Sequence, residues 1–322
     1  MLSETVKLVL NSSHETGDDL YPIDIAAVPD NFIGHGAKTT VLSRRVHRAR
    51  PGLCLATKYK DSLEIKHVRP VCLRKWLATR KAIKMANFVL VHGAWHGGWC
   101  WGRVANQLVQ QGHRVLTPTL TGLGDRAHLL SRDVNLDTHI QDVIGTIETE
   151  ELTEVTLCGH SYGGVVITGA ADQITDRISS IVYLDAFIPE DGQAQRDLIP
   201  VARRADAELL VKQMGDGWKV PPRSAESFMV QSQEDRDWVN RRCVPHPYAT
   251  MTQPISLTGN WKNISCKTFI KAGLYATSPF GPFAEAARNN AGWQYEEIDA
   301  GHDVMLDAPK ELTDGLVRAA AL

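Results

Sequence analysis

The sequence predicts an α/β fold with a mostly parallel, doubly wound sheet and a helical cap inserted between two of its strands. Three observations lead to this prediction. Short apolar runs alternate with helical apolar patterns from residue 88 to the C-terminus. A serine between two glycines follows one of these runs, at residues 159–163. The alternation stops between residues 187 and 262, where charged residues mix with aromatic ones.

The expected strands share short apolar runs, as strands buried on both faces require. They are residues 88–91, 115–118, 155–158, 181–184, 268–270 and 293–298. The expected helices share apolar residues at helical spacing. They are residues 101–108, which Gly112 should end, and residues 136–147 and 309–320. Residues 187–262 should form a cap over the strand ends, where an open α/β sheet places its ligand crevice. The alternative is a second small domain with no role at the site.

The first 84 residues differ from the rest of the chain. They show no sustained hydrophobic period, and basic residues are scattered through their second half. One interpretation is an interaction tail or a targeting extension. The preferred interpretation is an N-terminal extension that is poorly ordered or not part of the native domain, because Met85 leads directly into an apolar strand. The folded domain should then be residues 85–322.

Composition narrows the classes of function. The 322 residues carry a formal net charge of −2, so no global basic field indicates a nucleic-acid partner. The apolar runs are of strand length, far short of a membrane span, and no secretory signal opens the chain. The six cysteines include no C-x-x-C pair and no zinc-binding spacing. Free thiols in a reducing, cytoplasmic compartment are therefore expected, with no metal.

Residues 155–170 predict a nucleophile elbow, in which a serine sits on a sharp turn between a strand and a helix. Ser161 is the predicted nucleophile. Gly159 and Gly163 flank it two positions away on each side, where a side chain would clash with the neighbouring strand or helix.

A serine hydroxyl needs a base to take its proton. The chain has twelve histidines, so position decides, and His302 lies between the last strand and the last helix. A carboxylate should orient that imidazole. The loop after residues 268–270 contains no Asp or Glu, whereas Asp185 ends the preceding strand and is the predicted acid. It could instead be a capping or loop carboxylate, and the weaker alternatives for the acid are Glu190, Asp191 and Asp299.

An oxyanion hole needs two main-chain N–H groups. We expect them from Tyr162, after the nucleophile, and from Ala94, because Gly93 lets that backbone approach closely. No phosphate-binding pattern fits residues 93–98. The residues expected to line the substrate pocket are apolar side chains near the elbow or in the cap, for which core packing is the alternative. They are Trp95, Trp99, Trp218, Phe228 and Met305.

Three segments carry a family resemblance: residues 88–99 (FVLVHGAWHGGW), 159–164 (GHSYGG) and 301–302 (GH). From about Met85 to the C-terminus the chain resembles α/β-hydrolases, and among them small esterases related to plant methyl esterases and hydroxynitrile lyases. Lyase members usually carry threonine in place of Gly93 and lysine in place of Asp303, so these two positions favour an esterase. The acid usually found after the penultimate strand is missing here.

The predicted function is therefore that of a serine carboxylesterase, which cleaves a small apolar ester through an acyl-enzyme without a metal or organic cofactor. A carbon–carbon lyase and a weakly hydrolytic ligand receptor on the same fold are the alternatives. The sequence does not indicate an oligomeric state.

Overall fold

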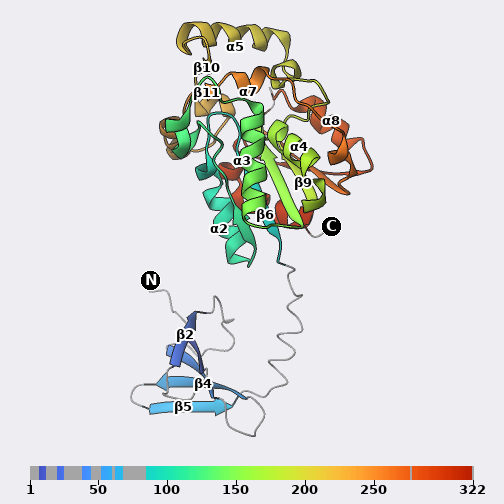
Figure 1. The fold of residues 1–322 in the computed structure, drawn as a ribbon. Coiled ribbons are helices and arrows are strands. Elements are labelled where there is room, and N and C mark those ends of the chain that lie inside the picture. The colour runs from blue at the N-terminus through green and yellow to red at the C-terminus, as the bar shows by residue number, and fades with distance from the viewer. Residues whose placement is uncertain are drawn as a thin grey trace. The chain divides into compact units, whose positions relative to one another are not determined.

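The computed structural model describes residues 85–275 and 278–320 and the backbone of five N-terminal strands. The chain divides into two compact units, Met1–Ile83 and Lys84–Leu322 (Figure 1). The boundary between them falls beside Met85, where the sequence analysis placed the start of the hydrolase-like domain.

The N-terminal unit contains one sheet in the order β2-β1-β3-β4-β5. Strands β1 and β3 run parallel, and the other neighbouring pairs run antiparallel. The strands are β1 (Lys7–Asn11), β2 (Leu20–Asp24), β3 (Lys38–Arg44), β4 (Gly52–Tyr59) and β5 (Ser62–His67). The sequence analysis assigned no strand to this segment. That residues 1–84 lie outside the native domain stays a prediction, which the mass of the protein from its native source would test.

The second unit is built on a six-stranded sheet in the order β13-β12-β9-β8-β6-β7. All neighbouring strands in it run parallel. The strands are β6 (Asn87–Val91), β7 (Arg114–Leu116), β8 (Val155–His160), β9 (Ile178–Leu184), β12 (Cys266–Ala272) and β13 (Trp293–Ile298). The predicted parallel sheet is confirmed, and each predicted strand lies at its expected place. The central strands read as continuous apolar runs because they are buried on both faces, as every residue of β8 is.

Helices cover both faces of this sheet. Helices α3 (Leu136–Thr149) and α4 (Gly163–Gln173) pack against each other in front of it in Figure 1, and α10 (Pro309–Ala320), which contacts α2 (Gly102–Gln110), lies behind. Helix α8 (Gly281–Arg288) packs on β12 and β13, and the short α9 (Val304–Asp307) precedes α10. Helix α2 ends as predicted, because Gly112 takes a φ of 91° that few other residues adopt.

Outside the insertion between β9 and β12, the short 3-10 helices described in this unit lie in its connections. They are η2 (Gly98–Trp101), η3 (Gly124–Leu129) and η4 (Thr175–Arg177). Helix α3 begins with a capping box in which Asn135 and Thr138 satisfy each other's main-chain N–H groups. The start of this helix is thereby set by local sequence as well as by its apolar face.

The insertion between β9 and β12 forms the predicted cap, but it is not wholly helical. It contains a two-stranded antiparallel ribbon of β10 (Lys219–Val220) and β11 (His246–Pro247). Its helices are η5 (Gln195–Leu198), α5 (Val201–Met214), η6 (Ala225–Phe228), α6 (Gln233–Arg242), α7 (Ala249–Thr252) and η7 (Asn260–Asn263). Figure 1 shows α5 lying across one end of the domain, at the top of the view.

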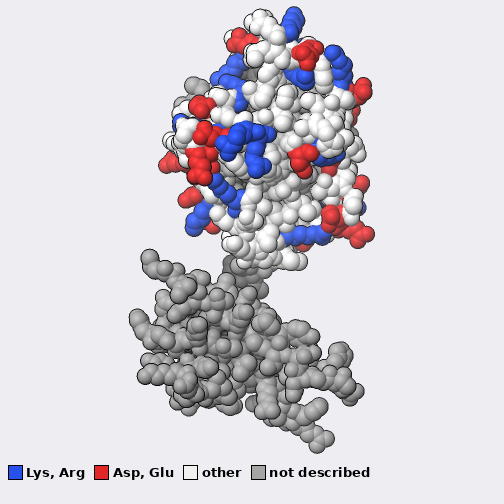
Figure 2. Space-filling view, turned by 90° about the vertical axis from the view of Figure 1, so that its left-hand side faces the viewer, with Lys and Arg blue, Asp and Glu red and all other residues white. Residues whose placement is uncertain are grey.

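Acidic and basic side chains are interspersed on the face of this domain drawn in Figure 2. Among the described helices, none is long and apolar enough to serve as a membrane span.

Candidate active site

Ser161 lies on the sharp turn between β8 and α4. Its backbone has a φ of 56°, a left-handed conformation that is costly for a residue with a side chain. The flanking glycines make this turn possible, because a Cβ atom on Gly159 would lie 2.6 Å from the carbonyl oxygen of Gly163. The main chain of Ser161 is held by its N–H, which donates to Leu184 O (3.2 Å), and by its carbonyl oxygen, which accepts from Phe187 N–H (3.2 Å). The predicted elbow geometry is therefore present.

His302 lies in the loop between β13 and α9, as the sequence analysis expected. Its main-chain N–H donates to the carbonyl oxygen of Phe228 in the cap (2.8 Å). Its ring packs between aromatic neighbours, with the Phe280 ring stacked at 5.0 Å and the Tyr275 ring also at 5.0 Å. Ser161 and His302 line the same cavity.

Asp185 contacts His302 although 117 residues separate them in sequence. Nδ1 of His302 donates to Oδ2 of Asp185 at 2.6 Å, and Asp185 is fully buried. Asp185 has a φ of 41°, and its N–H donates to Ile270 O at 2.7 Å. These contacts hold the carboxylate at the carboxyl ends of β9 and β12. Because the two strands are neighbours, an acid after either strand can reach the same imidazole.

The three weaker candidates for the acid have other surroundings. Glu190 pairs with Lys262 at the surface (2.7 Å), and Asp191 accepts the N–H of Leu257 (2.8 Å). An Oδ1 atom of Asp299 lies beside Gly273. The hydrogen bond of His302 therefore goes to Asp185.

The two expected oxyanion-hole residues, Ala94 and Tyr162, also line the cavity of Ser161 and His302. Within the described part of the chain, neither main-chain N–H has an acceptor. Gly93 brings the Ala94 loop close to the elbow, because a Cβ atom there would lie 2.9 Å from Cβ of Ser161. Both N–H groups are therefore free to bind a ligand oxygen in the cavity that Ser161 also lines.

The cavity has a volume of about 430 Å³. Two of the five predicted lining residues, Trp95 and Phe228, line it. The remainder of its lining is mostly apolar, with a few polar side chains from the cap. The lining residues that the sequence analysis missed include Gln195, Arg203, Arg223, Met251, Tyr275 and Phe280. Tyr275 and Phe280 lie in the loop after β12, which the sequence analysis searched for a carboxylate alone.

The other three predicted lining residues lie outside this cavity, and the expectation is corrected. The Trp99 ring stacks on His96 at 5.2 Å and meets Trp238 edge-on at 4.8 Å. Trp218 lies under the charged ends of Arg132 and Lys219. Met305 is fully buried in the core through α9. In each case the side chain packs against residues outside the cavity. Its position in the sequence does not indicate these packing partners.

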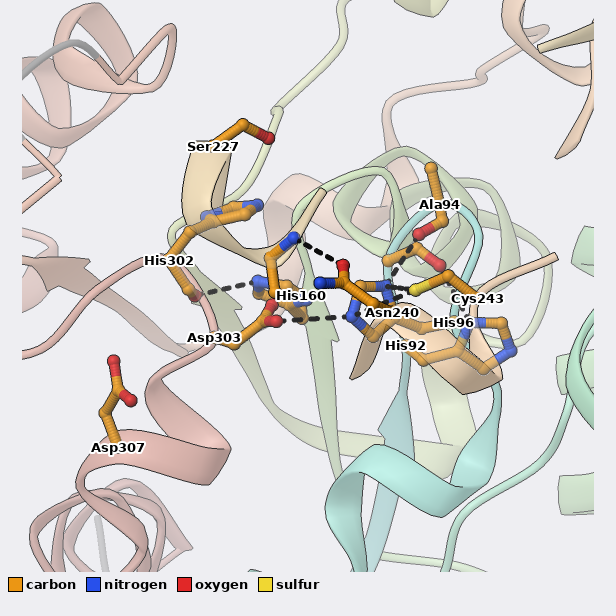
Figure 3. Close-up of polar contacts among 12 residues, drawn as sticks. His92, Ala94, His96, His160, Ser227, Asn240, Cys243, His302, Asp303 and Asp307 are labelled. Carbon is orange, nitrogen blue, oxygen red and sulfur yellow. Dashed lines mark hydrogen bonds and ion pairs between the residues drawn. The ribbon is translucent and has the colours of Figure 1, made fainter. Parts of the chain in front are cut away.

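His160, next to Ser161, supports the loop that carries His302. Its Nε2–H donates to the carbonyl oxygen of His302 at 3.0 Å (Figure 3), and the two rings lie 4.4 Å apart. Burial and the neighbouring His302 lower the pKa of His160 well below its ordinary value. His160 therefore stays neutral and does not repel a positive charge that forms on His302.

Residues that could hold a metal ion were sought among the His, Cys, Asp and Glu side chains. In residues 85–275 and 278–320, no group of three or more of them is arranged to do so.

A family model described as "Alpha/beta hydrolase family" matches residues 88–314. The chain belongs to the α/β hydrolase family. The hydrolase is 49% identical over 242 residues to the carbendazim hydrolyzing esterase of Nocardioides sp.. The matched segment covers 72% of this chain and 98% of that esterase. It is 33% identical over 117 residues to Methylesterase 10 of Arabidopsis thaliana. That match covers 36% of this chain and 42% of the methylesterase. Together with the fold, these relatives support esterase function.

A solved structure of similar fold is an extracellular α/β-hydrolase from Paenibacillus, with a TM-score of 0.65 and 25% identity, covering 73% of this chain and 98% of that one. A pyrethroid hydrolase from Sphingobium faniae has the same fold, with a TM-score of 0.58 and 21% identity over 74% of this chain and 98% of its own.

Proposed function

We propose that the hydrolase is a serine carboxylesterase, with Ser161 as nucleophile, His302 as general base and Asp185 as the orienting acid. The observation that carries the proposal is the 2.6 Å hydrogen bond from His302 Nδ1 to Asp185 Oδ2, on an imidazole that shares a cavity with Ser161. The bond places the proton on Nδ1 and leaves Nε2 free to accept a proton.

The reaction has two halves. Nε2 of His302 takes the proton of Ser161 while Oγ attacks the ester carbonyl, and the N–H groups of Ala94 and Tyr162 stabilise the negative oxygen. His302 then gives its proton to the leaving alcohol, and an acyl-enzyme remains. Water, deprotonated by His302, attacks the acyl-enzyme and releases the acid, which restores the Ser161 hydroxyl. The balance is one ester and one water consumed, one acid and one alcohol formed.

The substrate that we propose is a small ester with an apolar group. Its support is the size of the cavity, about 430 Å³, and the aromatic side chains of Trp95, Phe228 and Phe280 in its lining. The 49% identity to a carbendazim hydrolyzing esterase makes carbendazim the first compound to assay, beside short aryl esters.

The decisive experiment is Ser161→Ala in the full chain. Turnover of a short aryl ester should fall by about 10⁴-fold or more, because no nucleophile remains. The matched control is Ser179→Ala, which changes an exposed serine on β9 and should retain full activity. Full activity of Ser161→Ala would reject the mechanism.

A lyase or a receptor on this fold remains a separate candidate. A match of 36% identity over 105 residues to an alpha-hydroxynitrile lyase of Arabidopsis thaliana, 32% of this chain and 41% of that enzyme, favours testing the lyase. Gly93 argues against it, because the lyases that this chain resembles usually carry threonine at this position. Cyanide release from a cyanohydrin would favour the lyase. A folded sample in which a fluorophosphonate does not label Ser161 would favour the receptor.

We also propose a cytoplasmic location. Its support is that Cys100, Cys158, Cys243 and Cys266 are all free thiols. Fractionation of cells of the native source would test it, and recovery of the protein outside the cytoplasm would contradict it.

A further inference from the structure

His96 is a buried histidine whose two ring nitrogens both face hydrogen-bond acceptors. Nδ1 lies 2.8 Å from the carbonyl oxygen of Ala94, and Nε2 lies 3.3 Å from Oδ2 of Asp303. A carbonyl oxygen and a carboxylate can only accept, so each nitrogen carries a proton. The ring is then an imidazolium, and Asp303 is its counter-ion.

The neighbouring buried histidines differ in this respect. Nδ1 of His92 donates to Gly93 O (2.8 Å), while its Nε2 accepts from Leu120 N–H (3.1 Å). His160 donates through Nε2, and its Nδ1 has no partner in the described part of the chain. Each of these two rings needs one proton. Burial accordingly lowers the pKa of His92 to about 3.

Asp303 depends on His96 for its charge. It is fully buried, and among the described residues its Oδ1 has no hydrogen-bond partner. Burial alone would raise the pKa of this carboxyl, but the facing His96 lowers it to about 2. Burial alone would lower the pKa of His96. The facing Asp303 has the larger effect, so the pKa of His96 lies well above its ordinary value. Loss of either partner leaves an uncompensated charge in the interior or forces the other partner to neutralise.

Other titratable groups face this pair. Sγ of Cys243, from the end of α6 in the cap, lies 3.9 Å from both ring nitrogens of His96 (Figure 3). Among the described residues, the others that interact electrostatically with either partner are His92, His160, His302, Cys100 and Asp307.

The pair connects two segments of the active site that are 207 residues apart in sequence. On one side, His96 holds the carbonyl oxygen of Ala94, whose N–H is the expected oxyanion donor. On the other side, Asp303 directly follows His302. We propose that the His96–Asp303 ion pair is a positioning unit, an imidazolium bound to a carboxylate, which holds the oxyanion-hole loop against the loop of the catalytic histidine. This inference rests on the serine mechanism proposed above.

The kinetic test uses His96→Ala, Asp303→Ala and the double variant in the full chain. Each single variant should lower kcat by about 10- to 100-fold, because a displacement of about 1 Å in catalytic geometry costs this much. KM should change less than about threefold, since neither side chain lines the cavity. The double variant should be no slower than the slower single variant, because all three lose one shared contact. Asp303→Asn, whose amide can still bond a neutral His96, should recover part of the loss.

Asp172→Ala is the matched control. Asp172 is also a buried carboxylate, which accepts from the N–H groups of Thr258 and Trp261 at the far end of α4. Its loss should lower the melting temperature and leave kcat unchanged. Single-variant losses that multiply in the double variant, or a kcat near that of the unaltered protein in folded Asp303→Ala, would overturn the proposal. Neither result would affect the serine mechanism, which stands or falls on Ser161→Ala.

A measurement on the unaltered protein guards against variants that fail to fold. In ¹⁵N-histidine-labelled protein at pH 8, nitrogen NMR should show one histidine with protons on both ring nitrogens, since an ordinary histidine is neutral there. The signal should be lost in Asp303→Asn. If no such histidine exists at pH 8, the imidazolium, and with it the proposal, is wrong.

Discussion

The carboxylate of Asp185 accepts a 2.6 Å hydrogen bond from Nδ1 of His302, and it does so from the end of β9 rather than from the loop after β12. The main-chain bond from Asp185 N–H to Ile270 O ties the ends of these two neighbouring strands together. A carboxylate at the end of either strand can therefore lie within reach of the His302 imidazole.

Asp185→Asn should lower kcat by about 10²- to 10⁴-fold. The amide can hold the imidazole in the tautomer whose Nε2 carries the proton, and it does not stabilise the imidazolium. Steady-state kinetics on a short aryl ester would measure the loss. Asp299→Asn is the control and should retain activity. The reverse result, with Asp299→Asn inactive and Asp185→Asn active, would assign the acid to Asp299.

Gly159→Ala should impair both folding and activity. The new Cβ would lie 2.6 Å from the carbonyl oxygen of Gly163, so the elbow must shift, at a cost of about 1–3 kcal/mol in the free energy of unfolding. Gly145→Ala is the matched control, because nothing lies within 4 Å of a Cβ there, in the middle of α3. That control should gain up to about 1 kcal/mol. Urea denaturation would compare the two, and equal stabilities would contradict the steric account of the elbow.

The His96–Asp303 pair should make the protein lose stability as the solution becomes alkaline. Asp303 outweighs burial and raises the pKa of His96 above its ordinary value of 6.5. The stabilisation from this proton is complete below about pH 6.5 and is lost as the pH rises through the raised value of the folded state. The expected slope is up to about 1.4 kcal/mol per pH unit.

Urea denaturation between pH 6 and pH 9 would measure this slope. His96→Gln should remove the slope. Asp172→Asn should keep it, because the carboxylate of Asp172 in the unaltered protein is already ionised throughout this range. A slope that survives in His96→Gln would assign the effect to another group.

Phe228→Ala should weaken substrate binding. The ring lines the cavity and lies 5.7 Å from the ring of His302. A buried aromatic contact is worth about 1.5–3 kcal/mol, so KM for an aryl ester should rise by about tenfold or more. Trp218→Ala is the control for the corrected position of Trp218 outside the cavity, and it should leave KM unchanged. A larger rise in KM for Trp218→Ala than for Phe228→Ala would contradict this placement.

The sheet was predictable because each of its strands is a short apolar run with its own local signal. The elbow was predictable for a similar reason, since a serine on that turn needs Gly159 and Gly163 at fixed offsets. The place of His302 at the cavity of Ser161 was predictable from its position between the last strand and the last helix. The five-stranded sheet of the first unit was missed, because its segment shows no sustained hydrophobic period.

The lining of the cavity was only partly predictable. Trp95 and Trp99 are four residues apart and equally apolar, yet Trp95 lines the cavity and Trp99 stacks on His96. The residue type indicates that a tryptophan side chain will be buried. It does not indicate which residues that side chain packs against.

What the sequence determined by itself is the order of strands and helices and the sharp turn that carries Ser161, because these depend on residues close together in the chain. What the tertiary structure alone decided is which distant groups meet. Asp185 reaches His302, and Asp303 reaches His96, because a parallel sheet brings the ends of separate strands to one edge. A hydrogen bond depends on the distance in space between its two partners. The number of residues between them in the chain does not determine that distance.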